Sequence, residues 1–309
     1  MKEQRRPTRS RGYTAYRKIR YLARTGSLFR PGNSSVIASD GLTRSGYLVI
    51  ALNSLVYFLI AYLLVYTLNL FVMGYAAMLF NIPAILYYYD VDYLIRSIDW
   101  SPDSVMGVFS SGPIVMFVLT LFLLILYKSV ETEKGILRLL VLWMIFHTLT
   151  RILGEILAGA ILGKGFGFVI LYIFLMDTGK VVLTILSLAA MYYIGTRMTR
   201  ISLFTANTYF NNLIGRQKSK FVLYQFLVPF ILGDLIILMV KMPIFNSFDM
   251  SVNAAMLLLL LPLLIRSYRI EDMYFDEEKR RIGIRMVAAI TLVVMITAFR
   301  VLFGTGIRL

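Results

Sequence analysis

Residues 47–89 contain no charged side chain, and this apolar stretch constrains the fold more than any other feature of the chain. A helix needs about 20 consecutive apolar residues to cross the hydrocarbon core of a bilayer. Several other runs approach that length, and 59% of the 309 residues are hydrophobic. Because backbone groups inside a bilayer must be hydrogen-bonded within the protein, the sequence predicts an all-α integral membrane protein.

Seven membrane-spanning helices are expected, near residues 46–70, 112–130, 137–162, 166–195, 221–244, 250–266 and 284–305. The stretch 47–89 is long enough for one crossing or two, and the charges of the later loops favour one. With one crossing, the basic loops at 196–220 and 266–285 lie on the cytoplasmic side. We therefore expect a cytoplasmic N-terminus, a non-cytoplasmic C-terminus, and residues 71–89 re-entrant or in the outer interface.

The chain divides into a basic cytoplasmic segment, 1–45, and a polytopic helical membrane domain, 46–309. Residues 1–44 hold eleven Lys or Arg against two acidic residues. A basic, tyrosine-rich segment beside a membrane favours binding to anionic headgroups or to another protein chain over nucleic acid. The residues expected to make these contacts are Arg5, Arg6, Arg9, Arg11, Arg17, Lys18, Arg20 and Arg24.

Polar residues interrupt the third expected helix at a regular spacing. His147, Arg151 and Glu155 are four residues apart and therefore share one helix face. A charged side chain at the bilayer centre costs roughly 2.5–3.5 kcal/mol, so such residues are expected to be paired or functional. Asp177, Lys180 and Asp234 are also predicted at this depth, which gives a buried charge network of six polar residues.

The glycine-rich turn GKGFG, residues 163–167, predicts an antiparallel hairpin of the third and fourth helices. Counting back from that turn places Arg151 level with Asp177, so these two are expected to pair, with Glu155 and Lys180 completing the network. Gly154 and Ala158 predict close helix packing. Two other basic residues, Lys241 and Arg300, are expected to reach the interface without a special role.

Catalytic and metal-binding motifs are missing from the sequence. The chain has one histidine and no cysteine, which excludes an intact HExxH zinc site and Cys-ligated zinc. It also lacks a GxSxG nucleophile elbow. The acidic loop with Asp90, Asp92, Asp99 and Asp103 has no EF-hand spacing and is expected to form a solvated rim. We expect no enzymatic activity, no metal and no cofactor.

Two segments resemble motifs of the site-2 proteases: HTLTR at 147–151 and LMDTGK at 175–180. Only His147 and Asp177 match. Thr148 stands in place of the general-base glutamate, and Arg151 in place of the second histidine. The resemblance implies an inactive relic of that family.

The sequence thus favours a non-enzymatic membrane subunit or scaffold, in which the buried charges hold the helices together. The alternative is a proton- or ion-coupled transporter component that uses His147 and the intramembrane acids. An inactive relic of a site-2-protease-like membrane protein is a minor alternative.

Overall fold

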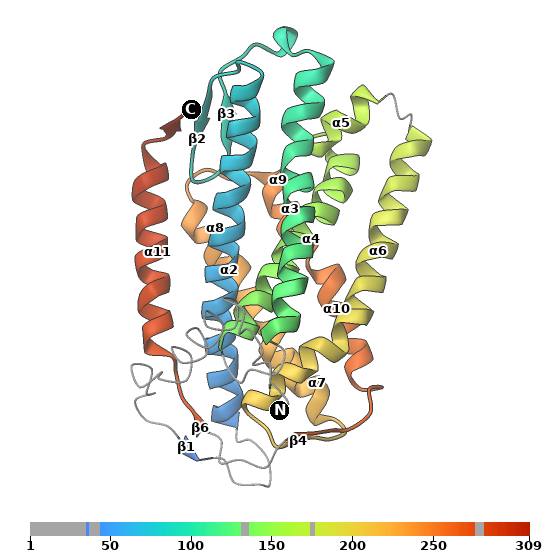
Figure 1. Ribbon diagram of the computed structural model, residues 1–309, viewed down its shortest axis with the longest axis vertical. Helices are drawn as coiled ribbons and strands as arrows, with labels where there is room; N and C mark the ends of the chain where they lie inside the picture. Colours follow the sequence, from blue (N-terminus) through green and yellow to red (C-terminus); the bar gives the residue numbers. More distant parts are fainter. Residues whose placement is uncertain (1–34, 37–43, 131–135, 174–176, 276–280) are drawn as a thin grey trace, which may run out of the picture.

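The computed structural model describes residues 35–36, 44–130, 136–173, 177–275 and 281–309, and it is mostly helical (Figure 1). The longer helices are α2 (Arg44–Leu79), α3 (Pro102–Val130), α4 (Ile136–Leu162), α6 (Asp177–Phe204), α8 (Val228–Lys241) and α11 (Met286–Gly304). The shorter ones are α5 (Phe166–Tyr172), α7 (Gln217–Val222), α9 (Ser247–Ala254) and α10 (Leu257–Ser267). A π-helical turn, Leu223–Leu227, joins α7 to α8, and 3-10 turns occupy Ser97–Asp99 and Thr205–Thr208.

Small antiparallel sheets lie at the two ends of the bundle. One contains β2 (Ala84–Leu86) between β3 (Val91–Tyr93) and β7 (Ile307–Arg308), with Leu86 opposite both Val91 and Ile307. The other pairs are β1 (Ser35–Val36) with β6 (Arg281–Ile282), and β4 (Asn212–Leu213) with β5 (Met273–Tyr274).

Within the described residues, seven helical segments are long and apolar enough to cross a membrane. They run Arg44–Leu79, Pro102–Val130, Leu137–Leu162, Asp177–Thr208, Gln217–Lys241, Ser247–Ser267 and Met286–Gly304. The number agrees with the sequence prediction, and most of the expected ranges overlap the observed ones closely.

Residues 47–79 of the uncharged stretch belong to one continuous helix, which agrees with a single crossing. With 36 residues, α2 is about 54 Å long, so it exceeds the hydrocarbon thickness of a bilayer. The re-entrant alternative for residues 71–89 was wrong for residues 71–79, because the helix continues without a reversal to Leu79. The remainder turns back as the β2–β3 hairpin, which β7 covers.

The fourth expected helix, 166–195, was also wrong. The turn at 163–167 does reverse the chain, and the added Cβ of an alanine at Gly167 would lie 2.3 Å from the carbonyl oxygen of Gly159. However, the returning helix α5 ends at Tyr172, and a new helix, α6, begins at Asp177. Asp177 therefore lies in the first turn of a helix rather than in the middle of one.

The two ends of the bundle differ in character (Figure 1). One end, here called the hairpin end, carries the β2–β3 hairpin, α5 and the last residues of the chain. The opposite end, here called the basic end, carries the start of α2, α7, and the connecting residues 205–216, 268–275 and 281–285. The described parts of the basic loops at 196–220 and 266–285 thus lie at the same end as the start of α2, as a single crossing of α2 predicts.

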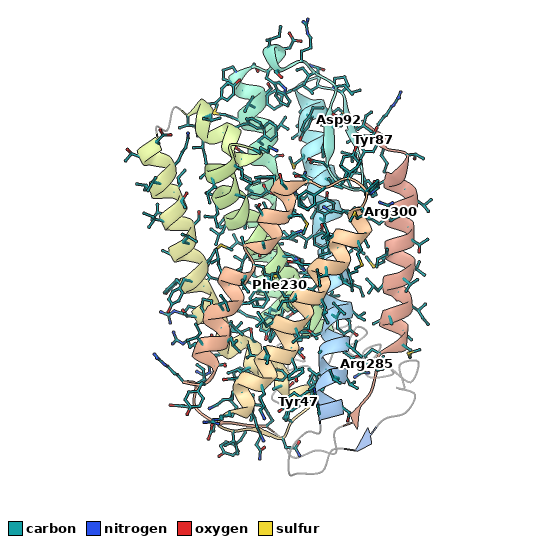
Figure 2. The ribbon with its side chains drawn as sticks, turned by 180° about the vertical axis from the view of Figure 1, so that it is seen from behind. Tyr47, Tyr87, Asp92, Phe230, Arg285 and Arg300 are labelled. Atoms are coloured by element: carbon teal, nitrogen blue, oxygen red, sulfur yellow. The ribbon has the colours of Figure 1, made fainter. Side chains whose placement is uncertain are left out.

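Helices α2 and α4 form the centre of the molecule. Phe58, Trp143, Phe146 and Phe226 are fully buried, and the rings of Phe58 and Trp143 meet edge to face at 4.9 Å. Trp143 Nε1 donates a hydrogen bond to Ser54 Oγ (2.9 Å), which satisfies its polar atom in the core. Two helices lie at the periphery, because most of the apolar surface of α6 and α11 remains exposed. Figure 2 shows the bundle with its side chains from the opposite side, with Phe230 labelled.

Candidate functional site

The polar stripe of α4 is buried as the sequence predicted. His147, Arg151 and Glu155 are each 5% exposed and lie on the face of α4 that looks into the bundle. Arg151 Nη1 lies 3.7 Å from Glu155 Oε1, a separation longer than a hydrogen bond. Glu155 is thus held near a positive charge but is not fully paired by it.

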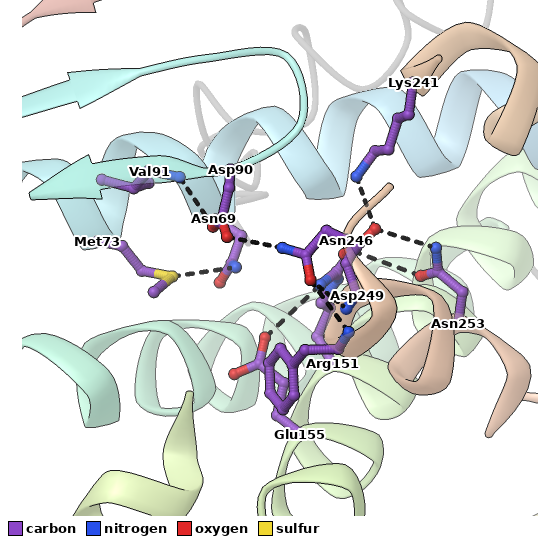
Figure 3. A network of polar contacts seen from close by, with 11 residues as sticks. Asn69, Met73, Asp90, Val91, Arg151, Glu155, Lys241, Asn246, Asp249 and Asn253 are labelled. Atoms are coloured by element: carbon purple, nitrogen blue, oxygen red, sulfur yellow. Dashed lines mark hydrogen bonds and ion pairs between the residues drawn. The ribbon is translucent and has the colours of Figure 1, made fainter. Parts of the chain in front are cut away.

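The partner of Arg151 is Asp249 rather than Asp177. Arg151 Nη2 donates to Asp249 Oδ1 at 2.6 Å, and both side chains are only 6% exposed (Figure 3). Gly154 makes this contact feasible, because its bare Cα lets α4 approach the backbone of α9. A Cβ at that position would lie 3.0 Å from the carbonyl oxygen of Val252. The predicted close packing at Gly154 is therefore confirmed, with α9 as the partner helix.

Lys241 also binds Asp249. Its Nζ donates to Asp249 Oδ2 at 2.6 Å, and the residue is 4% exposed. The expectation that Lys241 reaches the interface was wrong, because α8 ends beneath the hairpin end and directs this side chain inward. One carboxylate thus bridges two cations that come from different helices, α4 and α8 (Figure 3).

Helix α2 supplies an aromatic wall to the same cluster. Lys241 Nζ lies 3.5 Å from the ring centroid of Tyr66, and the Arg151 guanidinium lies 5.0 Å from it. Tyr62 stacks on Tyr66 at 5.3 Å. Cations over aromatic faces gain most where water is excluded, so this wall stabilises both charges.

Asparagines fix the position of Asp249. Asn246 is the N-cap of α9, and its Oδ1 accepts hydrogen bonds from the backbone N–H groups of Phe248 and Asp249. Asn253 lies one turn further along α9, and its Oδ1 is 3.4 Å from Arg151 Nη2. The carboxylate in the first turn of α9 also interacts favourably with the positive end of the helix dipole.

The β2–β3 hairpin contributes a second carboxylate. Asp90 Oδ1 accepts from Val91 N (2.8 Å), and Asp90 Oδ2 accepts from Asn246 Nδ2 (2.6 Å). Partial removal of water from its carboxylate raises the pKa of Asp90, and the hydrogen bond from Val91 opposes that shift. Asp90 remains exposed, as the solvated-rim expectation has it, but its carboxylate also joins the cluster through Asn246. Asp99 forms an exposed pair with Arg96 (2.8 Å).

A cavity of about 40 Å³ adjoins the cluster. Its polar wall is made by Asn69, Asp90, Arg151, Glu155, Asn246 and Asp249, and aromatic residues including Tyr66, Tyr89 and Phe109 make much of the rest. A single water molecule requires roughly 10–15 Å³ of such volume, so the cavity has room for two or three.

The other predicted network residues lie elsewhere. Asp177 has a 96% exposed side chain and pairs with Lys180 of its own helix (3.0 Å). Asp234, which is half-buried in α8, has no hydrogen bond or ion pair with any residue that the structure describes. The sequence predicts Asp177 in the network because it predicts one unbroken helix over residues 166–195. It predicts Asp234 there only from its depth along its own helix.

His147 belongs to the aromatic core rather than to the ion-pair cluster. Its Nε2 donates to the carbonyl oxygen of Phe58 (3.2 Å), and its ring lies 4.7 Å from that of Phe58. Asp177, the other residue of the site-2-protease resemblance, is exposed at the start of α6. The two matching residues therefore do not form one site.

The basic tail residues Arg5 to Arg24 lie outside the described residues. Within the described part of the chain, no group of three or more His, Asp or Glu side chains has an arrangement suited to a metal ion. A comparison with protein-family models, with curated proteins and with solved structures finds no match to this chain.

Sequence reasoning missed Asp249 by a small boundary error. The sixth helix was expected to begin at residue 250, whereas α9 begins at Ser247. The signal was present: Asn246 followed three residues later by Asp249 resembles a helix N-cap pair. Recognising it would have moved Asp249 from a loop into the bundle.

Proposed function

We propose that this chain is a multi-pass integral membrane protein that acts as a non-enzymatic subunit or scaffold of a membrane complex. The observation that carries the proposal is the bridged triad of Arg151, Asp249 and Lys241. It joins α4, α8 and α9, and Tyr66 adds α2. Each of the three ions has a direct partner at 2.6 Å, which suits a fixed structural connection rather than a group that must change state.

The proposed orientation places the basic end in the cytoplasm. The described basic residues of that end include Arg197, Arg200, Arg216, Lys218, Lys220, Arg266, Arg269 and Arg285. Such a bias toward one set of loops is typical of the cytoplasmic side. The N-terminal tail would lie on the same side, where anionic headgroups or a cytoplasmic protein chain can bind its arginines.

Partner chains in the membrane are the second part of the proposal. The outward side of α11 exposes Ile290, Val293, Val294, Val301 and Leu302. In a bilayer such sides face lipid or the helices of other chains. A subunit role predicts that part of this apolar surface is covered in the assembled complex.

Chemical cross-linking in intact membranes, followed by purification in a mild detergent, tests the subunit role. The proposal predicts that other chains co-purify in fixed stoichiometry and that cross-links include residues of α6 or α11. The same membranes without cross-linker, purified in a harsh detergent, are the control, from which the chain is released. A chain that is monomeric in the mild detergent and forms no cross-links in the membrane contradicts the proposal.

A second candidate function, coupling to a proton or ion, is favoured by one observation. Glu155 is incompletely paired and lines a polar cavity that also reaches Asp90. Reconstituted vesicles would report it as an ion- or proton-dependent flux that Glu155→Gln abolishes while the protein remains folded. Vesicles whose flux equals that of protein-free vesicles exclude it.

A further inference from the structure

We propose that the cavity beside Glu155 binds one monovalent alkali cation. The inference rests on three separate features of the cavity wall: its net charge, its unpaired oxygen atoms and its size. It does not depend on the subunit role, because the cavity is present in the single chain.

The charges around the cavity do not balance. Asp249 engages both cations of the cluster, Arg151 and Lys241. Glu155 and Asp90 remain, so the cluster that the cavity adjoins holds three carboxylates and two cations, with a formal sum of −1. Lys241 belongs to this cluster through Asp249 but does not line the cavity, and Asp234, which also lies outside the lining, has no hydrogen bond or ion pair with the described residues of the cluster. Glu155 is the buried and incompletely paired member of the cluster, so its charge is costly, and one monovalent cation would compensate it.

The side chains that line the cavity include oxygen atoms without a hydrogen-bond donor. Asn69 lines the cavity and is 4% exposed, and its Nδ2 donates weakly to Met73 Sδ (3.5 Å). Its Oδ1 has no hydrogen-bond partner among the described residues and lies beside Gly112 of α3, so it reaches the cavity only after a rotation of the side chain. The Glu155 carboxylate has only the 3.7 Å contact with Arg151. Together with Asp90, these two residues offer oxygen ligands from α2, α4 and the hairpin, and hard cations prefer oxygen ligands.

The size and composition of the site point to a singly charged ion. A volume of about 40 Å³ accommodates a desolvated alkali cation with one or two waters. A divalent ion is less suited, because the described residues include no metal-binding arrangement of three or more His, Asp or Glu side chains. Asp90 is both a wall of the cavity and an exposed residue, so the ion would enter from the hairpin end.

Thermal unfolding of the purified full chain in detergent tests the proposal. The chain is titrated with NaCl or KCl at pH 8, and choline chloride keeps the chloride concentration and ionic strength constant. A site that binds only the folded state raises the unfolding temperature with added ligand. We expect the unfolding temperature to rise and reach a plateau as NaCl or KCl replaces choline chloride. The ion that fits the cavity better should give the larger rise.

Two variants identify the site. Glu155→Gln removes a charge without changing size, and Asn69→Leu removes the free oxygen; each is expected to weaken the apparent affinity at least tenfold. Asp177→Asn is the matched control, since that exposed acid lies outside the cavity, and it should leave the cation response unchanged. If either cavity variant is too unstable to melt cooperatively, ²²Na⁺ binding to wild type, with and without competing K⁺, replaces the melting readout.

Identical unfolding curves in NaCl, KCl and choline chloride, with no saturable ²²Na⁺ binding, would overturn the proposal. So would a response that follows pH alone and is the same in all three salts, since that result assigns the missing charge to a proton on Glu155 or Asp90. A cation response equal in wild type and Glu155→Gln would place the ion outside this cavity and would also contradict the proposal.

Discussion

The surroundings of Arg151 depend on two things: its own position along α4, and the residue at which the neighbouring helix α9 begins. The sequence correctly indicated that a buried arginine must meet a carboxylate, because an unpaired charge at this depth is expensive. It did not indicate which carboxylate, since that depends on where α6 and α9 begin. The predicted start of the sixth helix was three residues too late, so Asp249 was not expected inside the bundle. The prediction of one unbroken helix in place of α5 and α6 made Asp177 the expected partner of Arg151.

His147 gives a prediction at the same scale. His147→Gln should lower the free energy of unfolding by only about 1 kcal/mol, because the amide can still donate to the Phe58 carbonyl while the aromatic contact is lost. Denaturant titration of the purified variant measures this change. A loss of several kcal/mol would show that His147 takes part in the charge network after all.

Close backbone contact between helices decides the packing at the scale of elements. Gly195 of α6 lies against α10, where an added Cβ would come 2.3 Å from the carbonyl oxygen of Leu259. Hydropathy predicted both helices but not the contact between their backbones. A glycine in the sequence indicates close packing without identifying the helix that packs against it. The break between α5 and α6 was missed for a related reason, because an apolar run reads the same whether or not the helix is continuous.

Gly195→Ala should therefore force α6 and α10 apart and destabilise the protein by about 1–3 kcal/mol. Gly304→Ala in α11 is the matched control, because nothing lies within 4 Å of its added Cβ. Melting temperatures in detergent compare the two variants. Equal stability of both variants would contradict the close contact.

A loop contact at the basic end predicts a pH effect. Lys218 Nζ donates to Asp272 Oδ1 (2.7 Å), and this bond, with one from Gly215 N, lowers the pKa of Asp272. A carboxyl with a lowered folded pKa stabilises the protein above its unfolded pKa, near 3.9, and this stability is lost as the pH falls through the folded value.

Asp272→Asn should accordingly be less stable than wild type at pH 6, and the difference should disappear as the pH falls below about 4. Melting temperatures of the two proteins across that range provide the measurement. A difference that persists unchanged at pH 3 would show that the charge of Asp272 does not contribute.

The whole molecule has a basic end and a hairpin end, and the loop charges alone were enough to group the loops correctly. The identity of the polar cluster was not predictable at this level, because residues far apart in sequence, from Tyr62 to Asn253, meet only after packing. Length and hydropathy fix the helix number, whereas the site depends on helix ends and close approaches.

Fusion reporters test the proposed orientation. A reporter after Leu309 should be active only on the non-cytoplasmic side, and one inserted near Gly215 only on the cytoplasmic side. Because Gly215 carries a loop hydrogen bond, a second insertion beside the exposed Glu271 serves as the control for the same end. The reverse pattern at both insertions would invert the orientation.

Two double-mutant cycles test directly whether Arg151 is tied to Asp249. The first combines Arg151→Leu with Asp249→Asn, and the second combines Arg151→Leu with Asp177→Asn. The free energy of unfolding in detergent is measured for every protein. We expect a coupling energy of about 2–3 kcal/mol in the first cycle, because the two side chains are in contact, and less than about 0.5 kcal/mol in the second. Additive effects in the first cycle, or strong coupling between Arg151 and Asp177, would contradict the network described for this protein.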